Sequence, residues 1–215
     1  MAQDVLIADY GSGNLRSLTN ALEQCARSDQ RVVLSGDPAA VARAERIVLP
    51  GVGAFGECRR KLDESGLLPA LGAAVAAGKP LFGICVGMQV LASRGLEFGE
   101  TAGLGWVPGV TRRLRLPETA GESNGDARVP RLKLPHVAWT PVEILDEALF
   151  DGIPQGSHFY FVHSYFLECA EPGDIAATAV HGERFTAAVR RDNVFGSQFH
   201  PEKSDTPGLR LLENF

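Results

Sequence analysis

The sequence predicts an α/β protein with a mostly parallel central sheet flanked by helices and an additional antiparallel β portion. Two patterns lead to this fold class. Up to about residue 90, short β-rich runs alternate with helical patterns, an order that builds a parallel sheet covered on both faces. From Leu104 onward, short β-rich runs follow one another with turns between them. With 215 residues, 45% of them hydrophobic and 22% charged, we expect one domain over residues 1–215.

The first half supplies the elements of the parallel sheet. Apolar runs predict strands over residues 4–8, 31–34, 46–49 and 81–84. A helix is expected after the first strand because Leu15, Leu18, Leu22 and Cys25 recur at helical spacing, and Asp37-Pro38 marks the start of a short helix. Further helical segments are predicted over residues 67–77 and after Gly87.

The second half is predicted to be β-rich and partly antiparallel. Its strands are expected over residues 110–116, 132–137, 159–162, 175–180, 185–190 and 194–199. The polar segment 117–130 has the composition of an exposed hairpin tip or a mobile loop, and no chemistry is assigned to it. A terminal helix is predicted over residues 207–215.

Charge and cysteine usage narrow the class of protein. A formal net charge of -5 argues against nucleic-acid binding. The start of the chain lacks a basic signal-peptide region, and no apolar run approaches the roughly 18 residues of a membrane span, so we expect a cytoplasmic protein without membrane contact. The four cysteines are widely spaced, which indicates neither a disulfide framework nor a metal site. We expect no cofactor.

Cys85 is the strongest candidate for a catalytic group. In Gly83-Ile84-Cys85-Val86-Gly87 it follows a predicted strand and precedes a predicted helix, as the nucleophile does in a nucleophile elbow. The flanking glycines are needed there because a β-carbon would clash with the neighbouring strand or helix. The N-terminus of the following helix also favours a thiolate. The alternative is a buried core cysteine, which the two glycines make less favourable.

His200 and Glu202 are the candidate base and its orienting carboxylate. His200 is expected to end the last strand, and strand alternation would put residues i and i+2 on one face, within reach of each other. For an oxyanion, the N–H of Val86 is one expected donor, and a second is expected from the glycine-rich loop 51–55. The same loop matches G-x-G-x-x-G, but no acid ends the next strand, so a dinucleotide site is discounted.

Two further segments place polar residues among apolar ones. Ser164-Tyr165, just past a predicted strand, is a candidate lining for a polar substrate pocket. For His136, His158 and His181 we expect a structural role, as strand ends with satisfied core histidines.

Taken together, these motifs resemble the class I glutamine amidotransferases, whose fold is flavodoxin-like. The resemblance rests on Gly83-Ile84-Cys85-Val86-Gly87-Met88-Gln89 and on Gln198-Phe199-His200-Pro201-Glu202-Lys203-Ser204. The segments 9–17, 49–55 and 160–165 are similar to those of the glutaminase subunits of imidazole glycerol phosphate synthase, and the similarity runs nearly end to end.

The resemblance implies an activity and a partner. Cys85, His200 and Glu202 would form a triad that hydrolyses glutamine through a thioester. The ammonia would pass to a (β/α)8-barrel cyclase subunit, forming a heterodimer that makes imidazole glycerol phosphate and an aminoimidazole carboxamide ribotide in histidine biosynthesis. The resemblance assigns the remaining site residues as follows: Val52, Gly53 and Val86 to the oxyanion, Gly51, Gln89, Glu97, Ser164 and Tyr165 to the substrate, and Asn14 and Lys203 to the partner interface.

The chain departs from the family pattern at one place. Where the family usually has Pro-His-Met-Gly-Trp-Asn, this chain has Pro135-His136-Val137-Ala138-Trp139-Thr140, beside the expected interface. Two alternatives stay open: a glutaminase of another pathway, such as anthranilate, aminodeoxychorismate or guanylate synthesis, and a non-catalytic α/β subunit that uses Cys85 as a redox sensor.

Overall fold

The computed structural model describes residues 3–117 and 132–215. Their centre is a mixed sheet of eight strands, in the order β2-β1-β3-β4-β14-β13-β12-β9. In that order the strands are Gln30–Ser35, Gln3–Ala8, Arg46–Gly51, Leu81–Cys85, Val194–Ser197, Glu183–Arg191, Ile175–His181 and Glu143–Ile144. From β2 to β14 all neighbours are parallel, and from β14 to β9 all are antiparallel. The predicted fold class, a mostly parallel sheet with an antiparallel portion, is confirmed.

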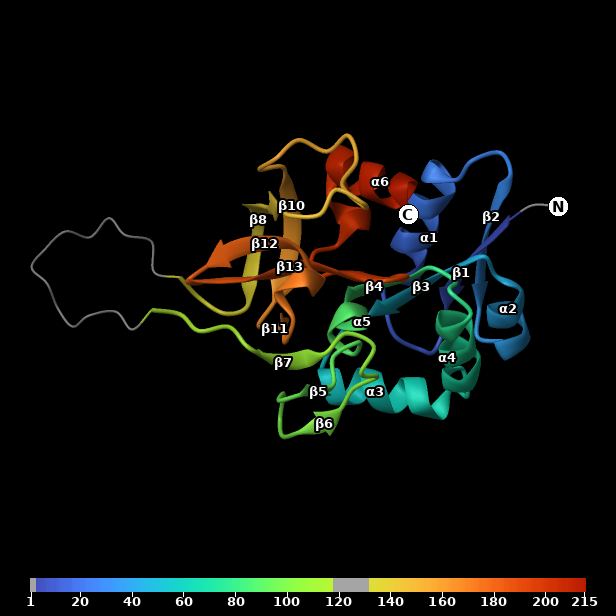
Figure 1. Ribbon diagram of the computed structural model, residues 1–215, viewed down its shortest axis with the longest axis horizontal. Helices are drawn as coiled ribbons and strands as arrows, with labels where there is room; N and C mark the ends of the chain where they lie inside the picture. Colours follow the sequence, from blue (N-terminus) through green and yellow to red (C-terminus); the bar gives the residue numbers. More distant parts are fainter. Residues whose placement is uncertain (1–2, 118–131) are drawn as a thin grey trace, which may run out of the picture.

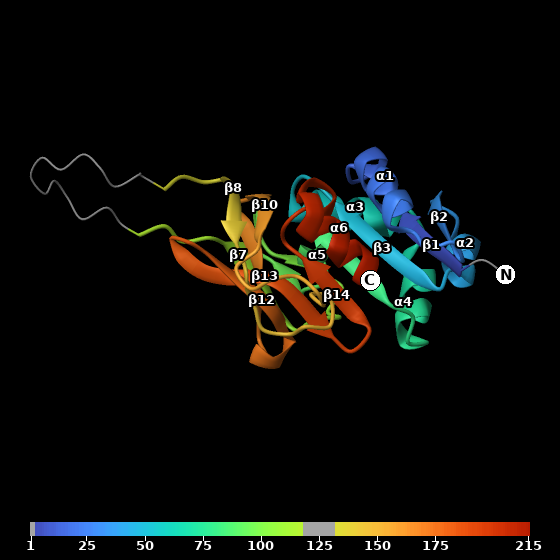
Figure 2. The same cartoon turned by 90° about the horizontal axis from the view of Figure 1, so that it is seen from above.

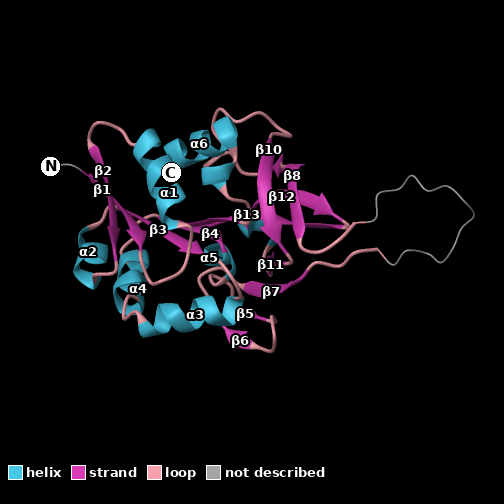
Figure 3. Cartoon of the chain, turned by 180° about the vertical axis from the view of Figure 1, so that it is seen from behind, coloured by secondary structure: helices cyan, strands magenta, loops and turns pink. Residues whose placement is uncertain are grey.

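Helices cover both faces of the parallel strands. Figures 1 and 3 show α1 (Leu15–Cys25) and α6 (Asp205–Asn214) packed together on one face. The helices α3 (Phe55–Glu64), α4 (Leu68–Ala76) and α5 (Val86–Gln89) lie on the other, and α2 (Pro38–Arg43) packs against α4. Every residue of β4 is buried, as expected for a central strand covered on both sides.

Two small sheets extend the antiparallel end of the molecule. One pairs β8 (His136–Pro141) with β10 (His158–His163), and the other has the order β11-β7-β5-β6, with bounds Tyr165–Cys169, Gly109–Arg113, Arg94–Gly95 and Thr101–Ala102. Figure 2 shows this β-rich part at one end of the sheet and α2 at the other. Between Ser197 and α6 the chain makes a short 3-10 turn, η2 (Pro201–Lys203).

The topology brings three loops to one edge. β3, β4 and β14 are parallel neighbours, with Gly51 paired to Cys85 and Ser197 paired to Ile84. Their carboxyl ends therefore open side by side, which is where ligands bind on such sheets. The loop 51–54, the turn at Cys85 and the segment 198–200 all begin there.

Several predicted bounds were wrong. The whole of α3 was missed. The helix predicted after Gly87 begins one residue before it, at Val86, and is a single turn that ends at Gln89. The strand predicted over 132–137 begins only at His136, β14 ends at Ser197 rather than Phe199, and β11 was not predicted. Of the polar segment 117–130, all but Pro117 lies outside the described residues. No helix in the described part is long and apolar enough to cross a membrane.

Candidate active site

Cys85 lies at a strained turn between β4 and α5. Its backbone angles are φ 55° and ψ -112°, a region that non-glycine residues adopt at a cost of about 1 to 3 kcal/mol. Such strain persists only where the surrounding structure enforces it, and it often marks a functional site. The strained turn that the sequence predicted at Cys85 is present.

Two glycines make this turn sterically feasible. A β-carbon on Gly87 would lie 2.0 Å from the carbonyl oxygen of Leu49, and one on Gly83 would lie 2.7 Å from that of Gly87. Gly51 has the same function on the neighbouring strand, where a β-carbon would meet the nitrogen of Gly87 at 2.3 Å. All three positions exclude side chains because main chain packs directly on main chain.

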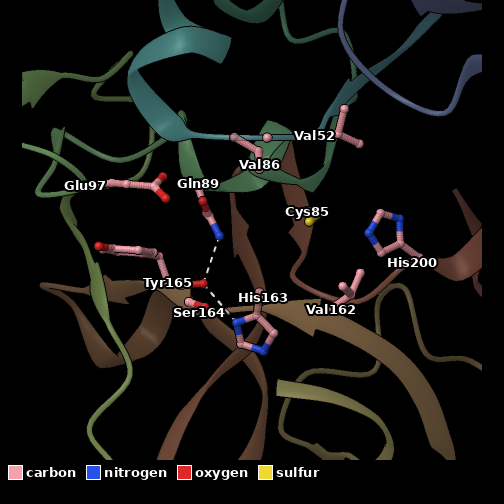
Figure 4. A pocket seen from close by; sticks show the side chains of 11 residues that line it. Val52, Cys85, Val86, Gln89, Glu97, Val162, His163, Ser164, Tyr165 and His200 are labelled. Carbon is pink, nitrogen blue, oxygen red and sulfur yellow. Dashed lines mark hydrogen bonds between the residues drawn. The ribbon is translucent and has the colours of Figure 1, made fainter. Parts of the chain in front are cut away.

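Cys85 faces a cavity of about 310 Å³ at the carboxyl edge of the sheet (Figure 4). The cavity brings together residues from five segments of the chain, and most of the predicted site residues are among them. Its lining is Val52, Gly53, Cys85, Val86, Gln89, Glu97, Val162, His163, Ser164, Tyr165 and His200.

His200 lies on the same cavity and is bonded to Glu202. The Nδ1 atom of His200 is 2.8 Å from Oε1 of Glu202, and both side chains are at least 95% buried. The contact was predicted from strand alternation, and that reason was wrong. β14 has ended at Ser197, and it is the 3-10 turn η2 that carries the carboxylate back under the ring.

The environment of His200 favours its charged form. Burial alone would lower the pKa of His200, but its interactions with the Cys85 thiolate and with the Glu202 carboxylate outweigh burial and raise the pKa to about 10. A carboxylate on Nδ1 leaves Nε2 as the ring nitrogen available for proton transfer. The pair has the chemistry of a general acid and base with its orienting group.

A chain of amides connects Cys85 to the far wall of the cavity. Gln198 donates from Nε2 to the Cys85 Sγ at 3.7 Å, and its Oε1 accepts from Nε2 of Gln89 at 3.0 Å. Gln89 Nε2 also donates to the carbonyl oxygen of Tyr165 at 2.8 Å. These side chains are fixed by one another before any ligand enters.

Two of the predicted oxyanion donors, the N–H groups of Val86 and Val52, differ in whether they are already hydrogen-bonded. Val86 is the first residue of α5, so its N–H has no partner within the helix. The N–H of Val52 instead donates to the hydroxyl of Ser12 at 3.2 Å. Behind this loop, the hydroxyl of Tyr10 donates to the carbonyl of Pro50 and lies 3.0 Å from the Cys58 Sγ. The loop 50–52 is therefore held by side chains from the loop that follows β1.

The other predicted site residues are spread around the cavity. Glu97 lines it, and its Oε2 accepts from the N–H of Phe55 at 2.7 Å, at the start of α3. Asn14 lies just before α1, half-buried and outside the cavity lining. Lys203 is exposed, with its Nζ 5.9 Å from the centre of the Tyr160 ring.

Sequence reasoning missed four residues of the site: Ser12, Val162, His163 and Gln198. His163 follows Phe159 and Phe161 on the buried face of β10, and Gln198 lies in a buried run beside Phe199, so each is a polar residue at an interior position, a pattern that indicates a polar cavity wall. Of the histidines assigned a structural role, His136 is buried and His181 half-buried, whereas His158 is exposed at the start of β10. Among the described residues no group of three or more His, Cys, Asp or Glu side chains is arranged so that it could hold a metal ion.

A family model and the related proteins indicate the same family for this chain. The family model described as "Glutamine amidotransferase class-I" matches residues 6–215. The chain is 48% identical to "Imidazole glycerol phosphate synthase subunit HisH" of Caulobacter vibrioides, covering 99% of this chain and 97% of the relative. It is also 48% identical to the protein of that name from Rhizobium meliloti, covering 98% and 97%.

Two solved structures share the fold at lower identity. One is titled "Crystal structure of glutamine amidotransferase", with a TM-score of 0.68, 20% identity and coverage of 95% of this chain and 94% of that one. The other is "Structure of PurLQS from Thermotoga maritima", with a TM-score of 0.68, 18% identity and coverage of 100% and 97%.

Proposed function

The chain belongs to the class-I glutamine amidotransferases, and within them to the family of imidazole glycerol phosphate synthase subunit HisH; on this premise we propose a function for its cavity. The protein is a glutaminase subunit in histidine biosynthesis. It hydrolyses L-glutamine to glutamate and ammonia and acts in the cytoplasm as a single domain. The observation that carries this proposal is the placement of Cys85, at a strained turn, on one cavity with the bonded pair His200 and Glu202.

The geometry supports catalysis in two halves. The Cys85 thiolate attacks the carbon of the glutamine side-chain amide, and the tetrahedral intermediate releases ammonia when His200 transfers its proton to the leaving nitrogen. His200, now neutral, takes a proton from water, and the resulting hydroxide attacks the thioester. Glutamate leaves, and the proton held by His200 restores the starting state. Glu202 keeps Nε2 directed at the reacting atoms and stabilises the charged ring.

Charge on the oxygen of the tetrahedral intermediates requires N–H donors. Val86 supplies one, because its N–H is free of the helix hydrogen-bond pattern. Val52 or Gly53 supplies the second from the opposite loop. The Val52 N–H is bonded to Ser12, so its peptide has to turn before it can donate to an oxyanion. Gly53, with φ 86° and no atom within 4 Å of an added β-carbon, can absorb such a rotation.

The amino-acid end of glutamine is bound at the other end of the cavity. Gln89 and the main chain at Ser164 and Tyr165 form this wall, and Glu97 provides a negative charge for the substrate ammonium group. Gly51 supports this site without contacting the substrate, because the main chain of α5 packs directly against it.

The ammonia is delivered to a (β/α)8-barrel cyclase subunit in a heterodimer. The name "subunit" in the related proteins supports a partner of this kind. The outer face of β8 and β10, beside the cavity, supports its location: Val137 and Trp139 are 55% and 46% exposed, and Trp139 packs against Tyr160. Lys203 borders this region beside Tyr160, and Asn14 is included as a further interface residue because the family resemblance assigns it there.

The test is an assay with and without the partner. The purified chain and its cyclase are combined with the ribonucleotide substrate, and glutamate formation is measured. We expect glutamate formation to depend on Cys85: the variant Cys85→Ala loses it, while the complex still makes imidazole glycerol phosphate when ammonium is supplied. Glutamate formation by Cys85→Ala, or loss of the ammonium-dependent reaction with the fold intact, contradicts the proposal.

A further inference from the structure

Three histidines pack together behind the cavity wall. They are His136 of β8, His163 of β10 and His181 at the end of β12. The ring centre of His136 is 5.1 Å from that of His163 and 4.1 Å from that of His181. His163 lines the cavity, whereas His136 is 1% exposed and does not reach it. The catalytic steps above use none of the three.

The hydrogen bonds of His136 and His163 form one chain. Thr140 Oγ1 is 2.8 Å from Nε2 of His136, Nδ1 of His136 is 3.1 Å from Nε2 of His163, and Nδ1 of His163 is 2.9 Å from the carbonyl oxygen of Tyr165. We call this series of bonds the histidine relay. It runs from a buried hydroxyl on β8 to the wall of the cavity.

The direction of every bond in the relay follows from its last member. A carbonyl oxygen only accepts, so Nδ1 of His163 carries the proton and its Nε2 is a bare acceptor. Nδ1 of His136 must then donate, which leaves Nε2 of His136 as an acceptor. That acceptor takes the hydroxyl proton of Thr140. Both histidines are thus Nδ1–H tautomers, and Thr140 is the donor that makes this arrangement complete.

Both rings stay neutral in this arrangement. Burial, together with the neighbouring imidazoles, lowers the pKa of His136 to about 4 and that of His163 to about 3. Within residues 3–117 and 132–215, neither ring is hydrogen-bonded to a carboxylate that would stabilise a charge. A neutral imidazole has one donor and one acceptor, so a change at one end of the relay forces a change at the other.

The last acceptor of the relay is also part of the substrate wall. The Tyr165 carbonyl accepts from His163 and from Gln89 (Figure 4). Gln89 in turn bonds Gln198 beside Cys85. The position of this carbonyl therefore depends on two donors, Nε2 of Gln89 and Nδ1 of His163, the second of which belongs to the relay.

We propose that Thr140 is a positioning residue for the glutamine site: by fixing the tautomers of His136 and His163 it holds the Tyr165 carbonyl and Gln89 in the geometry that binds substrate. This inference rests on the proposed function for the identity of the ligand. Thr140 replaces the asparagine usual in the family at this place, and both side chains offer a hydrogen-bond donor to Nε2 of His136.

The variant Thr140→Val separates the hydrogen-bonding role of Thr140 from its packing, because a methyl group of similar size replaces the hydroxyl. In Thr140→Val the Nε2 of His136 has no donor and is left buried and unsatisfied. If His136 changes tautomer, its Nδ1 becomes an acceptor, His163 must donate through Nε2, and a lone pair then faces the Tyr165 carbonyl. With or without this tautomer change, the relay loses one hydrogen bond, either at Nε2 of His136 or at the Tyr165 carbonyl. Thr140→Ser keeps the hydroxyl and the bond direction.

The test combines a spectroscopic signature with kinetics on the complex of full-length chain and cyclase. Nitrogen-15 spectra of labelled histidine identify the tautomer of each ring in the wild type and in the Thr140→Val and Thr140→Ser variants. Glutamine KM and kcat are measured in parallel. Thr186→Val is the matched control, because Thr186 is also buried but lies on β13 outside the relay.

We expect Nδ1–H tautomers for both histidines in the wild type and in Thr140→Ser. Thr140→Val should change the signals of both rings and raise the glutamine KM roughly three- to tenfold, the effect of one net hydrogen bond, with a smaller change in kcat. Thr186→Val should leave both tautomers and KM unchanged.

An Nε2–H tautomer in the wild type overturns the proposal before any variant is made, and so does a Thr140→Val protein with wild-type spectra and KM. A wild-type complex with no glutaminase activity but with the expected tautomers would contradict the proposed function rather than the relay.

Discussion

The main-chain N–H of Val52 donates to the side-chain hydroxyl of Ser12 at 3.2 Å, across 40 residues of sequence. The hydroxyl of Ser12 is buried and also lies 3.3 Å from the carbonyl oxygen of Val52, so one side chain holds both polar groups of this residue. Val52 is on the cavity where an oxyanion would form, yet its N–H is engaged elsewhere. Ser12 therefore keeps the Val52 N–H from acting as an oxyanion donor.

Removing this hydroxyl should raise the activity of the isolated chain. In Ser12→Ala the Val52 peptide is freed from a bond worth about 1 kcal/mol net, so glutaminase activity without the partner should rise about fivefold. The measurement is glutamate release by the isolated chain, with Ser65→Ala, at the far end of α3, as a control that leaves the rate unchanged. An isolated Ser12→Ala chain no faster than the wild type would show that Ser12 does not restrain this donor.

Glu202→Gln should change both catalysis and the titration of His200. Because the amide cannot stabilise an imidazolium as the carboxylate does, the pKa of His200 should fall below about 10, while its interaction with Cys85 remains. Glutaminase activity should fall by a factor of about 10² or more. An NMR titration of His200 in the wild type and in the variant checks the first effect, and a titration that is the same in both proteins would contradict it.

The interactions of His200 with Cys85 and with Glu202 also affect the stability of the protein in base. Because the folded-state pKa of His200 is raised, its contribution to the free energy of unfolding is full below about pH 6.5 and is lost as the pH rises from there to about 10. The melting temperature of the wild type should therefore decline over this window more steeply than that of Glu202→Gln. Equal slopes would mean that the ion pair adds no stability.

The elbow should not tolerate a side chain at Gly87. A β-carbon there would meet the Leu49 carbonyl at 2.0 Å, main chain that cannot move aside without shifting β3. We expect Gly87→Ala to cost about 3 kcal/mol or more in the free energy of unfolding. Gly72→Ala is the matched control, because Gly72 lies within α4 with no atom within 4 Å of an added β-carbon, and there alanine should stabilise by up to about 1 kcal/mol. Denaturant unfolding of both variants makes the comparison, and a stable Gly87→Ala protein would contradict the steric argument.

The buried histidines should make the protein sensitive to acid. The pKa values of His136 and His163 are lowered in the fold, so the unfolded chain binds more protons below about pH 6.5, and stability falls as the pH drops from there toward 4 and 3. Melting temperatures between pH 7 and pH 4 measure this fall for the wild type and for His136→Gln, which lacks one of the two groups. If both proteins lose stability in parallel, His136 is not a source of the acid sensitivity.

Local sequence predicted those parts of the site that short-range sterics determine. The spacing of Gly83, Cys85 and Gly87 was enough to indicate the strained turn, because only glycine fits where two main chains meet. The alternation of strands and helices in the first half placed β3 and β4 in one parallel sheet, so their carboxyl ends were expected at the same edge. That β14 joins them as a parallel neighbour was not predicted, because its residues were assigned to the partly antiparallel second half. The helix α3 was missed because its first residues were interpreted as part of a glycine-rich loop, although Phe55, Cys58 and Leu62 have the spacing of a buried helix face.

Contacts between distant segments could not be predicted. The bond from Val52 to Ser12 depends on the orientation of one peptide, and the histidine relay depends on how β8 packs against β10. His136 was expected to be a satisfied core residue, but nothing local indicated that its partner would be another histidine on the cavity wall. The contact between His200 and Glu202 was predicted by proximity in sequence, while the turn η2 that creates it was not.

The central claim is that Cys85 is the nucleophile of a glutaminase, and covalent trapping tests it most directly. The complex with the cyclase is treated with a glutamine-mimicking diazo-ketone, and its peptides are analysed by mass spectrometry. Burial raises the pKa of Cys25 and Cys58 to about 11 and that of Cys169 to about 12, so these thiols are poor nucleophiles at neutral pH. We predict one adduct per chain, on Cys85, formed in step with loss of glutaminase activity and prevented by glutamine. Inactivation with the adduct on another residue, or with Cys85 unmodified, would contradict the account.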